Sequence, residues 1–502
     1  MHYSEKAISG IAHPKPESRA VEKDGFRPDI EGLRGVAVSL VLLFHTGLLS
    51  GTALLTGGFI GVDLFFVVSG FLITGLLIRE RERNGRISFS RFYARRVRRI
   101  LPAAAVTLLI TIPLANAVVT LVDRPSVMED AASAALSIAN IRFAMTTDYF
   151  NPVNYSPFLH FWSLGVEEQF YFVWPALLTL VAWRWPRAGA AVALAAIVVV
   201  SFAASAAITE ISPSTAFYML PTRAWQLAAG GLLAVGAGSL ERLPGDLRNA
   251  ARQLLVLGGW AALAALAAVA VLANPVSTPY PGTVALVPTL AGVLLIASGP
   301  EPTGPGLLLR LAPIRFIGRI SYSLYLWHWP ILILGGLYLT GGALQLSGMA
   351  PQTITLAQAA ALAGLSIPVA TMSWFFVEEP FRRGAIPLPR PSRVVFAGVA
   401  VMAAVAVIGT GFDFGAQSAL AALGGNGATP SATEIATELA TASPTAATSL
   451  PPGTLPPGTP TPVPEMTPAL TPAPSMAPPS SYAITSAIRP ALGNAATDYE
   501  QP

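Results

Sequence analysis

Cysteine is absent from the 502-residue chain. The protein therefore has no disulfide, thiolate metal site, iron–sulfur cluster or cysteine nucleophile. Charge is also scarce, because Asp, Glu, Lys and Arg make up only 12% of the residues, against about a quarter in typical soluble proteins. Hydrophobic residues reach 53%. This composition excludes an ordinary soluble domain and predicts a chain that lies mostly in a lipid bilayer.

Long apolar windows recur along the sequence, each close to the roughly 20 residues that a helix needs to cross a bilayer. They span residues 34–52, 58–78, 100–122, 161–183, 188–208, 221–239, 253–273, 283–299, 320–340, 354–376 and 394–412. We therefore predict an all-α, polytopic membrane protein with eleven transmembrane helices.

Basic residues are distributed unevenly between these windows. With the amino terminus in the cytoplasm, 27 of the 31 lysines and arginines fall in cytoplasmic segments. Only Arg124, Arg142, Arg223 and Arg489 fall outside. Because cytoplasmic loops are enriched in basic residues, we predict a multi-pass plasma-membrane protein with a cytoplasmic amino terminus and an extracytoplasmic carboxyl terminus.

The two ends of the chain differ from its middle. Residues 1–33 are polar and read as a cytoplasmic lead-in. From residue 413 onward, 16 of the 44 prolines occur among Thr, Ser and Ala. Such a segment cannot build a core, so residues 413–502 are predicted to form a disordered extracytoplasmic tail, either a plain linker or a tether across the wall.

Arg34 and His45 lie eleven residues apart in the first window. On a helix this spacing returns to within about 20° of the same face and rises about 16 Å. A snorkelling arginine and a hydrogen-bonded histidine would be the structural explanation. Apolar packing does not require imidazole in mid-membrane, however, and histidine exchanges protons near neutral pH. We therefore predict that His45 is a functional group.

Asp63 stands near the start of the second window, on the same helical face as Gly70. The glycine would let another helix approach closely. The carboxylate could orient His45, pair with an arginine, or cap the helix at the outer surface, and the sequence does not choose among these. Glu167 and Glu168 are adjacent, about 100° apart on a helix, so we expect only one of them to face a site.

Two further groups of residues carry polar chemistry. Ser321, Tyr325 and His328 form a stripe at i, i+4 and i+7, which predicts either polar contacts between helices or a proton-handling or substrate-binding surface. Arginines crowd the cytoplasmic start of the third window. They suit the positive-inside rule, and they also suit a phosphate-bearing ligand. The cluster is Arg91, Arg95, Arg96, Arg98 and Arg99.

Five segments together resemble acyltransferase family 3, integral membrane acyltransferases that modify surface carbohydrates. They are the Arg34–His45 spacing preceded by Pro28, Asp29 and Gly32, GVDLFFVVSG at 61–70, WSLGVEEQFY at 162–171, YSLYLWHWP at 322–330 and EEPFR at 378–382. The resemblance covers about residues 26–384 and implies ten core helices within 34–384, with 394–412 as an eleventh.

The resemblance also implies a chemistry. It implies a cytoplasmic acyl-CoA donor and an acceptor hydroxyl on the outer side. We predict no bound cofactor and no metal. The resemblance makes Arg34 and His45 essential and assigns donor contacts to one of two pairs, Arg95/Arg98 or Arg96/Arg99. Many relatives add an external SGNH-type esterase-like domain, and the tail here contains no recognisable one. Direct transfer and hand-over to a separate extracytoplasmic transferase both stay open.

Acyl transfer to an alcohol needs a base and stabilisation of an oxyanion. His45 could be the base or a transient acyl carrier, Arg34 could steer the thioester, and Asp63 or Glu167 could fix the imidazole tautomer. We predict an O-acyltransferase, with acetyl as the default group, acting on a cell-envelope carbohydrate or a lipid-linked sugar. The alternatives are a proton-coupled transporter or flippase that uses the intramembrane histidines and carboxylates, and a scaffold that presents the tail.

Overall fold

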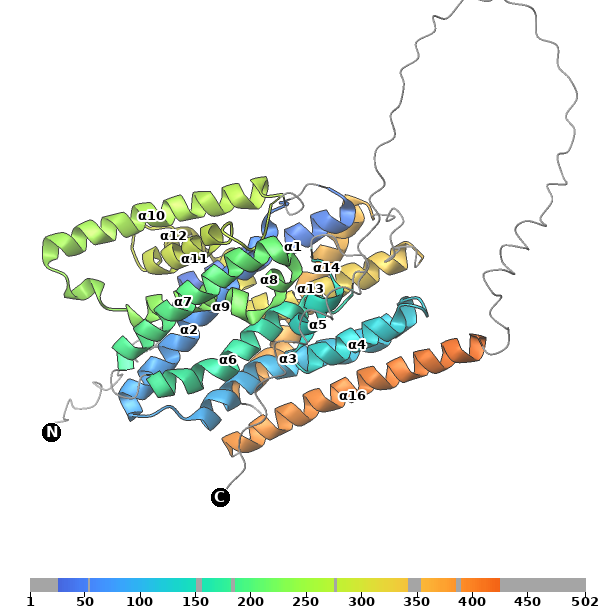
Figure 1. Cartoon of the computed structure of the whole chain (residues 1–502). Helices are drawn as coiled ribbons and strands as arrows, with labels where there is room; N and C mark the ends of the chain where they lie inside the picture. Colours follow the sequence, from blue (N-terminus) through green and yellow to red (C-terminus); the bar gives the residue numbers. More distant parts are fainter. Residues whose placement is uncertain are drawn as a thin grey trace, which may run out of the picture. The chain divides into compact units, whose positions relative to one another are not determined.

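A computed structural model describes residues 26–52, 55–149, 156–181, 186–274, 278–341, 354–384 and 390–424. In these segments the regular elements are all helices, and none is a strand. The main helices, shown in Figure 1, are α1 Pro28–Ser50, α2 Gly61–Asn84, α3 Phe89–Val118, α6 Phe161–Val181, α7 Pro186–Ile211, α9 Leu220–Val235, α10 Gly245–Leu272, α11 Leu286–Ser298, α13 Ala312–Leu339, α14 Leu356–Ser373 and α16 Pro391–Gly424.

Shorter elements lie between the main helices. They are α4 Arg124–Ala135, α5 Ala139–Thr146, α8 Pro213–Tyr218, α12 Gly306–Leu309 and α15 Glu379–Arg383, the 3₁₀ turns η1 Gly58–Ile60 and η2 Leu240–Arg242, and a π-helical turn, η3 Trp374–Glu378. None of these elements was predicted as a separate helix, because each is too short or too polar to form an apolar window of its own.

The prediction of an all-α, polytopic membrane protein is confirmed. Each of the eleven predicted windows falls on one of the main helices. By length and composition, seven helices of the described segments are able to cross a membrane. They are Pro28–Ser50, Gly58–Asn84, Phe89–Val118, Arg187–Ile211, Gly245–Leu272, Leu356–Arg383 and Pro391–Phe412, with Leu286–Ser298 as a shorter apolar helix.

Several predicted boundaries differ from the structure. Helix α3 begins at Phe89 rather than at residue 100, α10 at Gly245 rather than at 253, and α13 at Ala312 rather than at 320. Helix α1 begins at Pro28 rather than at residue 34, because a proline at its start and acidic residues in its first turn favour an earlier beginning. Helix α16 continues to Gly424, beyond the predicted end at 412. The rest of the predicted tail, residues 425–502, lies outside the described residues.

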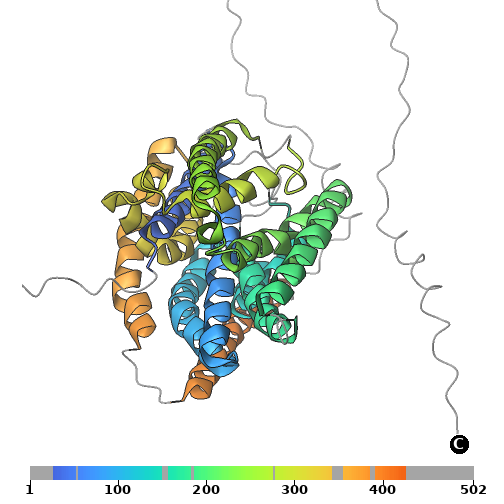
Figure 2. The same cartoon turned by 90° about the vertical axis from the view of Figure 1, so that its left-hand side faces the viewer.

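Glycines bring two pairs of main helices into backbone contact. A Cβ atom on Gly70 of α2 would lie 1.8 Å from the carbonyl oxygen of Leu227 in α9. One on Gly318 of α13 would lie 1.7 Å from the carbonyl oxygen of Glu31 in α1. Any larger residue would force the backbones apart. Close approach of α1 and α13 sets the face of α1 that carries His45 against α13, and Figure 2 shows the blue amino-terminal helices in the middle of the bundle.

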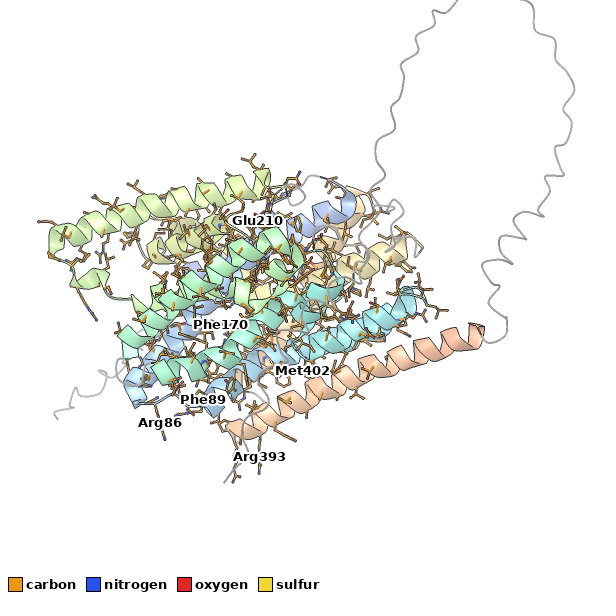
Figure 3. The ribbon with its side chains drawn as sticks, viewed as in Figure 1. Arg86, Phe89, Phe170, Glu210, Arg393 and Met402 are labelled. Atoms are coloured by element: carbon orange, nitrogen blue, oxygen red, sulfur yellow. The ribbon has the colours of Figure 1, made fainter. Side chains whose placement is uncertain are left out.

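The arginine-rich helix ends lie together at one end of the bundle. Figure 3 shows Arg86 and Arg393 at the same end as Phe89, away from Glu210. An ion pair of 2.6 Å joins Arg187 at the start of α7 to Glu82 at the end of α2. The segments that the charge pattern assigns to the cytoplasm are thus neighbours in space.

Candidate active site

His45 is buried in the interior of the bundle, with only 3% of its surface exposed. Its Nδ1 lies 3.0 Å from Nε2 of His328 on α13. Its Nε2 lies 3.1 Å from the hydroxyl of Tyr149, in the loop after α5. The Trp329 ring packs against the imidazole with the ring centroids 4.4 Å apart. Neither ring nitrogen faces lipid, and each has one polar partner.

A proline in α13 leaves one backbone carbonyl near the histidines without its usual helical hydrogen-bond donor. Pro330 has no N–H and therefore cannot donate to the carbonyl of Leu326 one turn earlier. Nε2 of His160 takes that place, 3.1 Å from the Leu326 oxygen. His160 thus stabilises α13 by supplying the hydrogen bond that Pro330 cannot make. It lies beside His328, with the ring centroids 5.8 Å apart.

A cavity lies between α1, α2, α3, α6 and α13 on the arginine-rich side of the histidines. Its lining combines guanidinium groups, carboxylates, hydroxyls and aromatic rings. It includes Arg34, Phe65, Phe66, Ser69, Arg96, Arg99, Ser163, Glu167, Glu168, Tyr171, Ser321, Tyr322 and Tyr325. Arg34 therefore faces this cavity, from the same helix that carries His45.

The structure separates the arginines of the two predicted pairs at the start of α3. Arg96 and Arg99 line the cavity, and Nε of Arg96 is buried without a hydrogen-bond partner among the described residues. Arg95 instead pairs with Glu80 at 2.8 Å, and Arg98 borders an apolar groove between α3 and α16. Of the two predicted pairs, only Arg96/Arg99 reaches the cavity. Residues three apart share a helix face, and the two pairs lie on different faces because they are offset by one residue, about 100° around the helix.

Both carboxylates of α6 line the cavity, which corrects the expectation that only one would face a site. Glu167 accepts hydrogen bonds from Ser69 at 3.0 Å and from Tyr171 at 2.8 Å. Glu168 accepts one from Ser137, before α5. The flexible side chains of adjacent glutamates reach different neighbouring elements, so the 100° between them does not keep either out of the cavity.

The predicted stripe on α13 connects the cavity to the histidines. Ser321 and Tyr325 line the cavity, whereas His328 contacts His45. The hydroxyls of Tyr325 and Ser163 lie 2.6 Å apart, and the Tyr325 and His328 ring centroids are 5.4 Å apart. Tyr325 therefore forms the wall between the arginine-lined space and the histidine pair.

Neither Asp63 nor Glu167 contacts His45. The hypothesis that one of these carboxylates fixes the imidazole tautomer is therefore wrong. Both ring nitrogens of His45 already have other partners. Asp63 follows the second alternative and pairs with an arginine: Nη1 of Arg223 lies 3.1 Å from it. Gln226 and Tyr280 also donate to this carboxylate.

We expect the Asp63→Ala substitution to destabilise the folded protein by about 3–5 kcal/mol, the usual cost of stripping a buried ion pair of one partner. It would leave Arg223, 1% exposed, without its carboxylate. Thermal unfolding in detergent micelles measures the effect. Glu241→Ala is the control, because its pair with Arg252 is exposed and worth about 1 kcal/mol or less. Equal melting temperatures for the two variants would contradict the prediction.

Several contributors to the site were not predicted from the sequence, among them Arg223 and Tyr149. Arg223 was counted among the few external basic residues, although an arginine inside an apolar window is itself a signal of a buried partner. Nothing in the pattern marked Tyr149, which lies in a loop between helices. Its ring stacks on Phe217 with the centroids 4.3 Å apart, and Nε of Arg223 donates to the Phe217 carbonyl at 2.9 Å.

The arrangement places an arginine-lined cavity next to a buried histidine pair. Guanidinium groups facing a partly enclosed cavity can bind phosphate oxygens. An imidazole with a polar partner on each nitrogen can take up or release a proton. Tyr325 and Ser163 lie between the two.

Comparison with known proteins places the chain among acyltransferases. A sequence model of the "Acyltransferase domain" family matches residues 27–375. "Peptidoglycan O-acetyltransferase OatA" of Listeria monocytogenes is 30% identical, over 71% of this chain and 56% of the relative. "O-acetyltransferase OatA" of Staphylococcus aureus is 28% identical, over 71% and 57%. "Putative peptidoglycan O-acetyltransferase YrhL" of Bacillus subtilis is 32% identical, over 61% and 49%.

The chain spans about half the length of these relatives. No solved structure matches it. The family match runs from α1 through α14 and includes Arg34, His45, the cavity and His328.

Proposed function

The chain belongs to the acyltransferase domain family, and on that premise we propose that it is a membrane O-acetyltransferase. The donor is acetyl-CoA on the arginine-rich side, which the charge pattern assigns to the cytoplasm. The acceptor is a hydroxyl of an envelope carbohydrate, with peptidoglycan favoured because two of the relatives carry that word in their names. The observation that carries the proposal is His45, buried next to an arginine-lined cavity in a chain of this family.

The cavity supports the donor assignment. Coenzyme A carries several phosphate charges, and arginine forks match phosphate oxygens in shape and charge. Arg34, Arg96 and Arg99 line one space, and the unpartnered Nε of Arg96 leaves a donor available there. In this proposal, Arg96 and Arg99 bind the phosphates and Arg34 steers the thioester arm towards Tyr325.

His45 supplies the base. A hydroxyl attacks a thioester well only when its proton is removed as the new bond forms. His45 is the group that can accept this proton, and Tyr149 marks the position from which a hydroxyl approaches its Nε2. The hydroxyls of Ser163 and Tyr325 lie at the cavity, and the Tyr325 ring lies beside His328, the partner of this base.

The proposal is tested by measuring base-labile acetate in purified peptidoglycan from cells that carry or lack the gene. We expect the acetate to fall on deletion and to return with the intact gene. A second measurement gives [¹⁴C]acetyl-CoA to inverted membrane vesicles and follows label into base-labile esters. Unchanged acetate on deletion together with no labelled ester would refute the acetyltransferase. Solute movement without acetyl-CoA consumption would favour the transporter.

A further inference from the structure

The hydrogen bonds around His328 determine where its proton lies. Its Nδ1 is 2.8 Å from the carbonyl oxygen of Tyr325 and 3.1 Å from that of Leu324. Carbonyl oxygens only accept hydrogen bonds, so Nδ1 must carry a hydrogen. A neutral imidazole has one N–H, and Nε2 of His328 therefore presents a lone pair.

The same reasoning determines which ring nitrogen of His45 carries a hydrogen. Its Nδ1 lies 3.0 Å from that lone pair, so Nδ1 of His45 must carry the hydrogen of this bond. Nε2 of His45 is then the unprotonated nitrogen, and it accepts from the Tyr149 hydroxyl at 3.1 Å. With both rings neutral, this is the arrangement that satisfies all of these contacts at once. A charged ring here would be desolvated, since His45 and His328 are 3% and 0% exposed.

We propose that His328 is a positioning residue that holds His45 in the Nδ1–H tautomer, so that Nε2 is the nitrogen that reacts. The two rings lie nearly parallel, at 15°, with centroids 5.2 Å apart. Helix α13 fixes His328 through its own backbone carbonyls, and the glycine contact with α1 fixes the distance between the helices. His328 thus does for His45 what a carboxylate does in other histidine-based sites.

The role rests on the proposed function and has a definite place in the reaction. The acceptor oxygen bonds to the acetyl carbonyl carbon while its proton moves to Nε2 of His45. The carbon–sulfur bond then breaks, and that proton passes to the departing thiolate, which gives coenzyme A and the acetyl ester. While His45 is an imidazolium, its Nδ1–H continues to donate to His328, which stabilises the charge.

Two substitutions at His328 separate positioning from packing. In His328→Gln, the amide oxygen can still accept from Nδ1 of His45, whereas His328→Leu offers no acceptor. We expect His328→Leu to lower kcat for acetyl transfer by about 100-fold or more with little change in KM for acetyl-CoA, and His328→Gln to stay within about tenfold of wild type, since a base with the wrong tautomer loses up to about 10⁴-fold.

The tautomer itself is read by ¹⁵N NMR of protein labelled at histidine in detergent micelles. The His45 signals, identified by their loss in His45→Gln, should show a protonated Nδ1 and an unprotonated Nε2 in wild type and in His328→Gln, but not in His328→Leu. The matched control is His160→Leu, which removes another buried imidazole next to His328. It should lower the melting temperature and leave the His45 tautomer unchanged.

Three results would overturn the role of His328. They are a protonated Nε2 on His45 in wild type, equal losses of kcat in the Gln and Leu variants, and a tautomer unchanged in His328→Leu. Failure of the proposed function is a separate result: wild-type protein would transfer no acetyl group, while the tautomer measurement would still decide how His328 and His45 are bonded.

Discussion

Replacing His45 with alanine is expected to lower acetyl transfer by about 100- to 10,000-fold, the usual contribution of a positioned general base. The alanine side chain offers nothing that can take the proton of the acceptor hydroxyl. The loss should appear in kcat, because His45 lies beyond Tyr325 and does not line the cavity proposed to bind the donor. Labelled ester formed from [¹⁴C]acetyl-CoA in membrane vesicles measures it.

Thr46→Val is the control for this variant. Thr46 is the next residue of α1 and is equally buried, and its hydroxyl donates to the Leu42 carbonyl one turn earlier. It should fold and transfer acetyl groups nearly as wild type does. If His45→Ala protein is present in the membrane at normal amounts and still forms labelled ester at the wild-type rate, His45 is not the base.

The arginines at the start of α3 provide the second large effect. Arg96→Gln and Arg99→Gln should each raise KM for acetyl-CoA by about 10- to 100-fold, since a hydrogen bond to a charged group is worth about 1.5–3 kcal/mol. The loss arises because each substitution removes a positive charge that faces the cavity. Initial rates at varied acetyl-CoA concentrations measure KM and kcat separately.

Arg95→Gln is the matched control, because the same change one residue earlier removes a charge paired with Glu80 outside the cavity. Its KM should differ from that of wild type by less than about threefold, as expected for a half-exposed pair. An Arg95→Gln effect as large as that of Arg96→Gln would mean that the positive charge of the loop, rather than the cavity, attracts the donor. Higher salt would then weaken all the variants alike.

Much of the architecture could be predicted from local sequence. A helix that crosses a bilayer must satisfy its own backbone hydrogen bonds and expose apolar side chains to lipid. Each such helix can therefore be recognised from the composition of its own residues, without reference to the other helices. For this reason every predicted window falls on a helix. The short helices α4, α5, α8 and α12 leave no such window.

The sequence also identified most of the polar residues that meet in the bundle. Arg34 and His45 share a face of α1, and Ser321, Tyr325 and His328 share a face of α13, because 3.6 residues per turn fix which side chains align along one helix. Periodicity along a helix says nothing about which other helix that face will meet.

The tertiary structure determines which helix faces meet. The glycine contacts between α1 and α13 set His328, rather than Asp63 or Glu167, against His45. A loop outside any periodic pattern supplies Tyr149. The sequence by itself therefore determined the helices and the faces that carry chemistry. Close packing of separate segments decided the partners, since a hydrogen bond of about 3 Å depends on how whole helices dock.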